Sequence, residues 1–356
     1  MLLIQKIILL IIFISFGYLL FKLIRKRQEI RNAMAEGFFG SHTQQTELNS
    51  VNQNNNEPSN IVSVEKPNLP LKEYFIKAAY NSALSGDFMN TDMIKYVLSR
   101  GCRFLDLEVF SIDNIPYVAY STDSTFLDID SKNKLQLSEV LKTIAGYGFM
   151  SPSPNPNDPI FIHFRIKSKD PELYKQIAMS IDLNLKTRLY KDERTGSIMV
   201  NGQTKLSKLM KKIIIVVDKS TAPNYKKYPE CDLEPCYNLS RYVNMESGGD
   251  TIRSYKYDRI INQQTTPPHI RDNRVSTDIS DLKMVFPDAG NDIIGALRNY
   301  GSNDLVLDYG VQIAFYRFYQ IDPNLIEYEK LFSDNKSAFI PMSRLINYIK
   351  TKEDLE

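Results

Sequence analysis

Hydrophobic and polar positions divide the chain into three parts. Residues 2–24 are almost entirely apolar, with an uncharged run from Ile7 to Phe21. Residues 33–68 are polar, rich in Asn and Gln, and show no apolar period. From Leu71 onward, apolar residues recur at the intervals typical of strands and helices. The pattern therefore predicts an apolar N-terminal segment, a polar linker and a globular region.

The N-terminal segment has the length that a bilayer requires, since about 20 apolar residues cross one as a helix. Lys6 and Lys22 at its borders can extend their ammonium groups toward water. No small-residue cleavage site follows, which favours an uncleaved anchor over the alternative of a signal peptide. We expect residues 1–27 to form a transmembrane anchor with a basic flank, and residues 28–70 to form a flexible polar linker.

Basic residues after the apolar run predict the orientation of this anchor. They are Lys22, Arg25, Lys26, Arg27 and Arg31. Because positive charge stays on the cytosolic side, we expect the rest of the chain to lie in the cytosol.

Strand and helix patterns alternate along the globular region. The predicted strands are 102–110, 115–121, 158–166 and 213–218, and the predicted helices are 90–101, 135–149 and 170–189, with a helix end at 206–212. Strands return within 281–292 and 305–325, whereas residues 225–281 are polar and show few clear elements. Alternating strands and helices indicate a parallel sheet. A length of about 280 residues favours an α/β fold of the TIM-type (β/α)8 barrel class over a sandwich.

Composition excludes several classes of protein. The 44 Lys and Arg residues nearly balance the 42 Asp and Glu residues, so charge gives no argument for a nucleic-acid partner. The three cysteines, Cys102, Cys231 and Cys236, make no disulfide framework. The Cys231–Cys236 pair lacks a second ligand pair nearby, so we expect no zinc site.

The stretch "FLDLEVF" places two acids on one face of a predicted strand. Side chains alternate along a strand, so Asp106 and Glu108 share a face with Phe104. Two carboxylates on an apolar strand are costly unless a metal, an arginine or water meets them. In "PIFIHFRI" the same alternation puts Arg165 on one face with His163.

The order of these segments resembles a known family. "YNSALSGDF", "GCRFLDLEVF", "IPYVAYSTDST", "PIFIHFRI", "KMVFPDAG" and "YGVQIAFYRFY" are similar to the catalytic barrel of phosphatidylinositol-specific phospholipase C in its eukaryotic two-part form. The resemblance covers roughly residues 71–332. It implies a first barrel half at 71–220, a variable linker at 221–281 and a second half at 282–356.

That family cleaves a phosphodiester with two histidines and a calcium ion. The resemblance places Tyr80 and Tyr120 at the histidine positions. His163 is the candidate for a substitute catalyst, while His42 lies in the linker and His269 in the polar middle region.

The resemblance also implies a vestigial calcium site. Asn81, Asp106 and Glu108 match metal ligands, and Arg165 stands where the remaining carboxylate belongs. A guanidinium there can pair with both acids in place of the ion. We therefore expect the protein to bind no cofactor, or to bind calcium if it retains activity.

The phosphate-binding positions of the family are also altered. Its two lysines correspond to positions near Val216 and Asp218, and its arginine and stacking tyrosine to positions near Met284 and Phe286. Lys283 is adjacent, so Lys283 and Arg165 are the candidate ligand-binding residues.

Three functions remain open from the sequence. The first is a membrane-anchored, catalytically inactive barrel, a pseudoenzyme that binds phosphoinositide headgroups or a protein partner. The second is an active phosphoric diester hydrolase that cleaves phosphatidylinositol-type lipids. The third is a purely structural protein tethered to a membrane. The expected partners are membrane lipids, including phosphoinositides, and a protein, with no nucleic acid.

Overall fold

The computed structural model describes residues 43–53, 59–121, 129–227, 237–249, 251–261, 282–287 and 298–354. The anchor expected at 1–27, His42 and His269 lie outside these ranges. Among the helices that are described, none combines the length and the apolar character needed to cross a bilayer.

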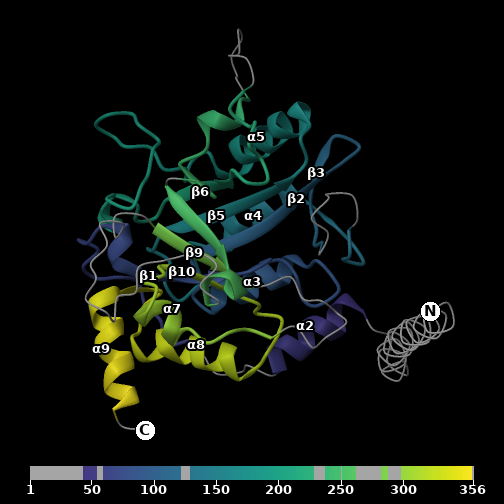
Figure 1. Ribbon diagram of the computed structural model, residues 1–356. Coiled ribbons are helices and arrows are strands. Elements are labelled where there is room, and N and C mark those ends of the chain that lie inside the picture. The colour runs from purple at the N-terminus through teal and green to yellow at the C-terminus, as the bar shows by residue number, and fades with distance from the viewer. Residues whose placement is uncertain are drawn as a thin grey trace, which may run out of the picture.

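Eight parallel strands in the described residues close into a barrel (Figure 1). They are β1 (Tyr74–Ala79), β2 (Phe104–Ile112), β5 (Ile160–Lys167), β6 (Ile213–Asp218), β7 (Met245–Ser247), β8 (Ile252–Lys256), β9 (Leu282–Phe286) and β10 (Ile313–Tyr316). The pairing of β1 with both β10 and β2 completes the circle. The expected TIM-type α/β barrel is confirmed.

Shorter strands extend the barrel wall. β3 (Ile115–Val118) pairs antiparallel with β2, and β4 (Leu135–Gln136) pairs with β3. β11 (Phe339–Pro341) pairs antiparallel with β1.

Helices lie outside the strands, and three of those described begin at polar side-chain caps. They include α3 (Thr91–Ser99), α4 (Leu137–Tyr147), α5 (Pro171–Leu185), α6 (Tyr257–Ile261), α7 (Asn303–Leu307), α8 (Pro323–Asp334) and α9 (Met342–Glu353). The side chain of Asn90 accepts from the first turn of α3, and that of Asp170 accepts from the first turn of α5. Such caps satisfy amides that have no partner within the helix.

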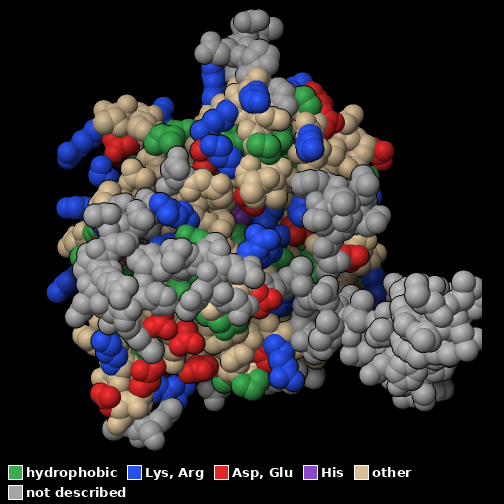
Figure 2. Space-filling model, in the orientation of Figure 1, with side chains coloured by type: hydrophobic (Ala, Val, Ile, Leu, Met, Phe, Trp, Pro, Cys, Tyr) green, Lys and Arg blue, Asp and Glu red, His purple; other side chains and the backbone are tan. Residues whose placement is uncertain are grey.

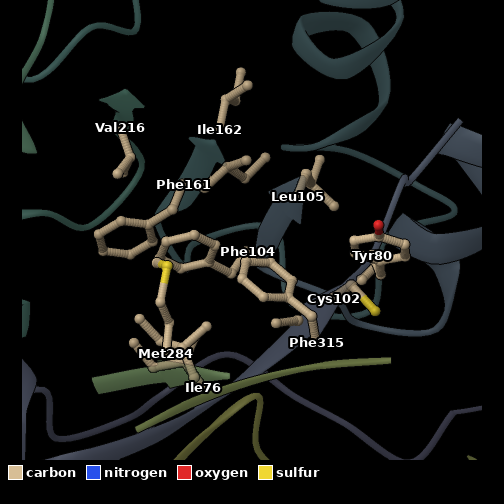
Figure 3. Packing of buried hydrophobic residues seen from close by; sticks show 14 of the residues in the cluster. Ile76, Tyr80, Cys102, Phe104, Leu105, Phe161, Ile162, Val216, Met284 and Phe315 are labelled. Atoms are coloured by element: carbon tan, nitrogen blue, oxygen red, sulfur yellow. The ribbon is translucent and has the colours of Figure 1, made fainter. Parts of the chain in front are cut away.

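Aromatic rings pack inside the barrel near the amino-terminal ends of β2 and β5 (Figure 3). Phe104 of β2 stacks on Phe161 of β5 with ring centroids 5.1 Å apart. Phe315 of β10 meets Phe104 edge to face at 5.5 Å. Phe104 and Phe161 lie at the amino-terminal ends of β2 and β5, and the polar residues of the same inward faces follow them toward the carboxyl ends.

The structure differs from the sequence pattern at three places. β7 and β8 lie within 221–281, where the pattern suggests a variable linker. The pattern does not reveal these strands because β7 has only three residues and β8 is largely polar. Residues Leu206–Lys208 form a single 3₁₀ turn rather than the end of an α-helix. Helix α2 (Gln44–Gln53) lies within the linker expected to be flexible, and two apolar residues give it too weak a period to detect.

Candidate functional site

The candidate site is built from layers of paired residues on β2 and β5. Phe104 lies beside Phe161, Asp106 beside His163, and Glu108 beside Arg165 in the register of the two parallel strands. Contacts with β7, β9 and β10 show that the face predicted by the alternation points inward, since His163 meets Ser247 and Phe286, and Phe104 meets Phe315. Each step of two residues moves one layer toward the carboxyl end, where barrels of this class hold their active sites.

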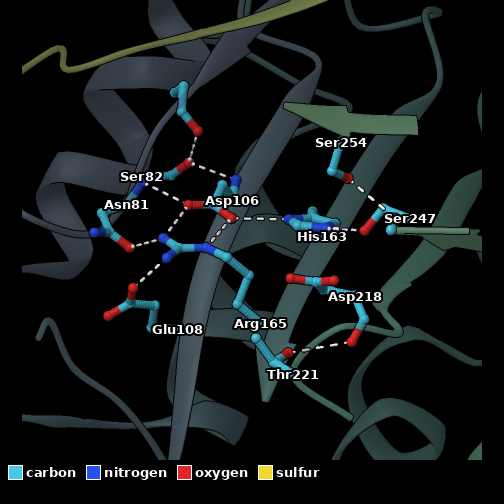
Figure 4. Close-up of polar contacts among 12 residues, drawn as sticks. Asn81, Ser82, Asp106, Glu108, His163, Arg165, Asp218, Thr221, Ser247 and Ser254 are labelled. Atoms are coloured by element: carbon cyan, nitrogen blue, oxygen red, sulfur yellow. Dashed lines mark hydrogen bonds and ion pairs between the residues drawn. The ribbon is translucent and has the colours of Figure 1, made fainter. Parts of the chain in front are cut away.

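Arg165 meets both acids and an amide (Figure 4). Its Nε donates to Asp106 Oδ1 at 2.9 Å, and one Nη donates to Asp106 Oδ2 at 2.6 Å and to Asn81 Oδ1 at 2.8 Å. The other Nη donates to Glu108 Oε1. The sequence left a metal, an arginine or water as the partner of the two acids, and the structure shows that the partner is an arginine.

The two carboxylates receive unequal support. Burial would raise the pKa of Asp106, but the charge of Arg165 and hydrogen bonds from His163 and Arg165 hold that pKa well below its usual value. Burial raises the pKa of Glu108, and Arg165 only partly opposes this. Asp106 has more donors, because the backbone amide of Asn81 also donates to it at 3.1 Å. For Arg165, the two carboxylates outweigh burial and hold its pKa well above the usual value.

Tyr80 and Tyr120 lie at the mouth beside this cluster. The guanidinium carbon of Arg165 lies 4.7 Å from the centroid of the Tyr80 ring. Burial raises the pKa of Tyr80 to about 12, and burial also raises the pKa of Tyr120. A phenol with so high a pKa is a poor base at neutral pH, since efficient proton transfer needs a pKa near the working pH.

Both ring nitrogens of His163 have partners. Nδ1 lies 2.8 Å from Asp106 Oδ1, and Nε2 lies 2.7 Å from Ser247 Oγ. The order of acid, imidazole and hydroxyl is that of a nucleophilic serine site. Here all three side chains are fully buried, and Asp106 is already paired with Arg165. The arrangement therefore orients Asp106. Ser247 was missed because β7 was not predicted.

Lys283 lies away from the cluster. Its Nζ donates to the carbonyl oxygen of Tyr309 at 3.0 Å. Because side chains alternate on β9, Phe286 lies on the opposite face from Lys283, and its ring centroid is 5.6 Å from that of His163. Strand β6 supplies Val216 beside His163, and the carboxylate of Asp218 accepts from the amide of Ser220 at 2.9 Å.

Three basic residues at the carboxyl ends of the strands were missed from the sequence. Lys167 follows Arg165 by two residues on the inward face of β5, and its charge acts to lower the pKa of Glu108. Lys256 of β8 places Nζ 5.6 Å from the centroid of the Phe286 ring. Arg317 follows β10, and its guanidinium carbon lies 5.6 Å from the Tyr80 ring. Figure 2 shows basic side chains gathered around the hollow on this face.

The oxygen atoms of the cluster do not fit a calcium ion as they stand. Calcium takes six to eight oxygen ligands, whereas the oxygens of Asn81, Asp106 and Glu108 are directed at the guanidinium of Arg165. Within the described ranges, no group of three or more His, Cys, Asp or Glu residues is arranged to hold a metal.

A buried amide nitrogen of the site finds no partner among the described residues. Asn81 Nδ2 is buried, and no described residue accepts its hydrogens. Asn81 also has a positive φ of 41°, which fixes the turn that carries it into the mouth. A buried amide nitrogen is normally hydrogen-bonded, so an acceptor from a ligand or from water would complete the site.

Comparisons with known proteins agree with this geometry. Residues 67–219 match the family model described as phosphatidylinositol-specific phospholipase C, X domain. No curated protein sequence matches the chain.

Two solved structures are similar in fold. The structure of PLC21 from L. pealei is 18% identical over 78% of this chain, with a TM-score of 0.58. That of PLC21 from S. officinalis is 16% identical over 77% of this chain, with a TM-score of 0.56. The matched regions span only 38% and 37% of those proteins.

The eight parallel strands and the inward polar layers define an α/β barrel of the (β/α)8 class. More narrowly, residues 67–219 of this barrel are similar to the X domain of phosphatidylinositol-specific phospholipase C, and the fold resembles that of the two PLC21 structures.

Proposed function

We propose that this protein is a membrane-attached, phospholipase C-like barrel that binds an anionic lipid headgroup of the phosphoinositide type without cleaving it. The observation that carries the proposal is the pairing of Arg165 with Asp106, Glu108 and Asn81. A guanidinium has no vacant coordination position for a substrate oxygen, so it cannot lower the pKa of a substrate hydroxyl as a bound metal does.

The side chains at the mouth also argue against hydrolysis. A positioned acid or base contributes about 10²–10⁴ to a rate, and Tyr80 with a pKa of about 12 cannot supply that at neutral pH. His163 has both ring nitrogens engaged and no exposed surface. We therefore propose that the barrel lacks the proton-transfer groups of a phosphodiesterase.

Positive charge at the mouth supports a phosphorylated ligand. Lys167, Lys256 and Arg317 lie at the carboxyl ends of three different strands, around the opening to Arg165. Asn81 Nδ2 adds a buried donor that no described residue satisfies. Phosphate oxygens are acceptors that suit both cationic and amide donors.

Attachment to the membrane rests on the apolar run at residues 2–24 and the basic residues that follow it. Anionic lipids attract such juxtamembrane basic residues. The same charge pattern supports a cytosolic location for the barrel.

The test uses the full chain reconstituted in vesicles that contain phosphatidylinositol bisphosphate. We expect no release of inositol phosphate above the protein-free control, with or without calcium. Soluble inositol trisphosphate should bind the reconstituted protein, and Lys256→Ala should weaken this binding by about tenfold, the loss of about one charge-assisted contact. Lys191→Ala is the matched control, because this exposed lysine precedes β6 at the opposite end of the barrel.

Two results would contradict the proposal. Turnover that disappears in Tyr120→Phe or His163→Ala would establish an active hydrolase. Equal, negligible binding of the headgroup by all variants would instead favour a structural or protein-binding role.

A further inference from the structure

Helix α2 is fastened to the loop that carries two residues of the site. Its Leu48 and Val51 are buried, each with 4% exposure, and join the main apolar core. The side chain of Gln44 donates from Nε2 to the carbonyl oxygen of Met89 at 2.8 Å. Although α2 is polar in composition, these contacts hold it against the barrel.

Glu47 makes the central contact of this helix. Its carboxylate accepts from Ser85 Oγ at 2.8 Å, from the amide of Asp87 at 2.9 Å and from the amide of Phe88 at 3.2 Å. Successive backbone amides that converge on one anion form a specific cradle. Glu47 is only 7% exposed, so this contact is built into the fold.

The loop is shaped for this carboxylate at Gly86. The residue has a φ of +154°, which L side chains rarely adopt. A Cβ at this position would lie 3.0 Å from Glu47 Cδ. Glycine therefore permits the close approach of the loop backbone to the side chain of α2.

This contact lies on the rim of the barrel mouth, which we define as residues 85–89 and 130–134. The loop after β1 begins with Tyr80 and Asn81 and then runs through 85–89. Its second half is joined to 130–134, since Lys132 donates its amide to the carbonyl of Asp87 at 2.8 Å. The backbone amide of Asp130 in turn donates to the carbonyl oxygen of Tyr120 at 2.9 Å.

We propose that α2 is a clasp that holds the mouth rim toward the lipid surface into which residues 2–24 insert. The proposal rests on the membrane attachment that we propose above. Residues 28–43 then act as the tether, and a random coil of this length has a root-mean-square reach of about 22 Å. Without the clasp the tether would extend to residue 58 and reach about 31 Å from a less defined point on the barrel.

The rim carries balanced charge and one aromatic ring. Asp87 and Asp130 offset Lys132 and Lys134, and Lys132 pairs with Asp87 at 2.8 Å, so no net charge on the rim opposes its approach to a bilayer. Lys132 also lies 5.2 Å from the centroid of the partly buried Phe88 ring, and an aromatic ring suits the boundary between headgroups and acyl chains.

The test measures energy transfer from the barrel to headgroup-labelled lipid in vesicles that carry the full chain. Donors are attached at Lys134→Cys on the rim or at Ser207→Cys, an exposed residue that precedes β6 at the other end, in a background with Cys231→Ser and Cys236→Ser. The two ends are on the order of 25 Å apart, from the length of the strands. We expect transfer from position 134 to exceed that from position 207 by about twofold.

Glu47→Ala should remove this difference, and Glu65→Ala, which changes an exposed acid outside α2, should preserve it. Thermal unfolding of both variants establishes that the barrel is folded. If the wild-type chain floats with the vesicles, it is attached to the membrane. Equal energy transfer from the two labels in that protein would then overturn the clasp proposal and leave the proposed membrane attachment intact. Failure of the wild-type chain to float would overturn membrane attachment and the clasp together.

Discussion

Replacing Arg165 by alanine removes the group that pairs with both carboxylates of the site. Asp106 and Glu108 have 0% and 1% exposure, so the charges that remain cannot be hydrated without opening the barrel. Removing one partner of a buried ion pair costs about 3–5 kcal/mol, because the other charge stays buried. The variant also loses the hydrogen bond to Asn81 and the contact with the Tyr80 ring. We expect the free energy of unfolding to fall by about 4 kcal/mol.

Urea unfolding of the full chain, followed by circular dichroism at pH 7, measures this loss. Lys167→Ala is the matched control, since it removes a cation two residues further along β5 and should cost less than about 1 kcal/mol. Calcium should restore stability to Arg165→Ala alone, because the freed oxygens of Asn81, Asp106 and Glu108 are ligands that calcium prefers. At 100 times its Kd, calcium would return about 2.7 kcal/mol. A loss below about 1 kcal/mol for Arg165→Ala would refute the reasoning.

Three further predictions follow from the pKa shifts and the clasp. The pKa of Asp106 is lowered in the folded protein, so the contribution of this carboxylate to the free energy of unfolding is complete above about pH 5 and is lost as the pH falls below about 4. In urea unfolding between pH 5 and 3, Asp106→Asn should therefore lose less stability with falling pH than the wild type. An equal loss in the two proteins would contradict the lowered pKa of Asp106. The pKa of Tyr80 is raised to about 12, so the unfolded chain ionises first and stability falls between pH 10 and 12; Tyr80→Phe should reduce that fall in thermal unfolding, whereas an identical fall would count against it. Gly86→Ala should increase amide hydrogen exchange in α2 and leave β5 protected, because a Cβ there meets the side chain of Glu47; unaltered exchange in α2 would mean that the loop does not depend on glycine.

Strong local patterns made the barrel and the acid cluster predictable. The period of two in "FLDLEVF" and "PIFIHFRI" placed Asp106 with Glu108, and His163 with Arg165, on shared strand faces. The pairing of Arg165 with the acids was expected because the resemblance to phospholipase C puts Arg165 where the remaining calcium carboxylate belongs. In the structure β2 and β5 are neighbours with a direct register, and Arg165 contacts both acids.

Other features depended on contacts between distant parts of the chain. Ser247 reaches His163 only through the closure of the barrel, and β7 is too short to show a period. Lys256 and Arg317 reach the mouth because their strands end at the same rim. The cradle for Glu47 depends on the loop at Gly86, 39 positions away in a segment with no pattern of its own.

The most direct test of the central claim is calcium calorimetry on the wild-type full chain. Because Arg165 holds the oxygens of Asn81, Asp106 and Glu108, we predict no heat of binding for calcium in the micromolar range. Arg165→Ala, measured in the same buffer, should show binding at one site. Micromolar binding by the wild-type protein that is lost in Asp106→Asn would contradict the account, since the acids would then be available to a metal in the presence of Arg165.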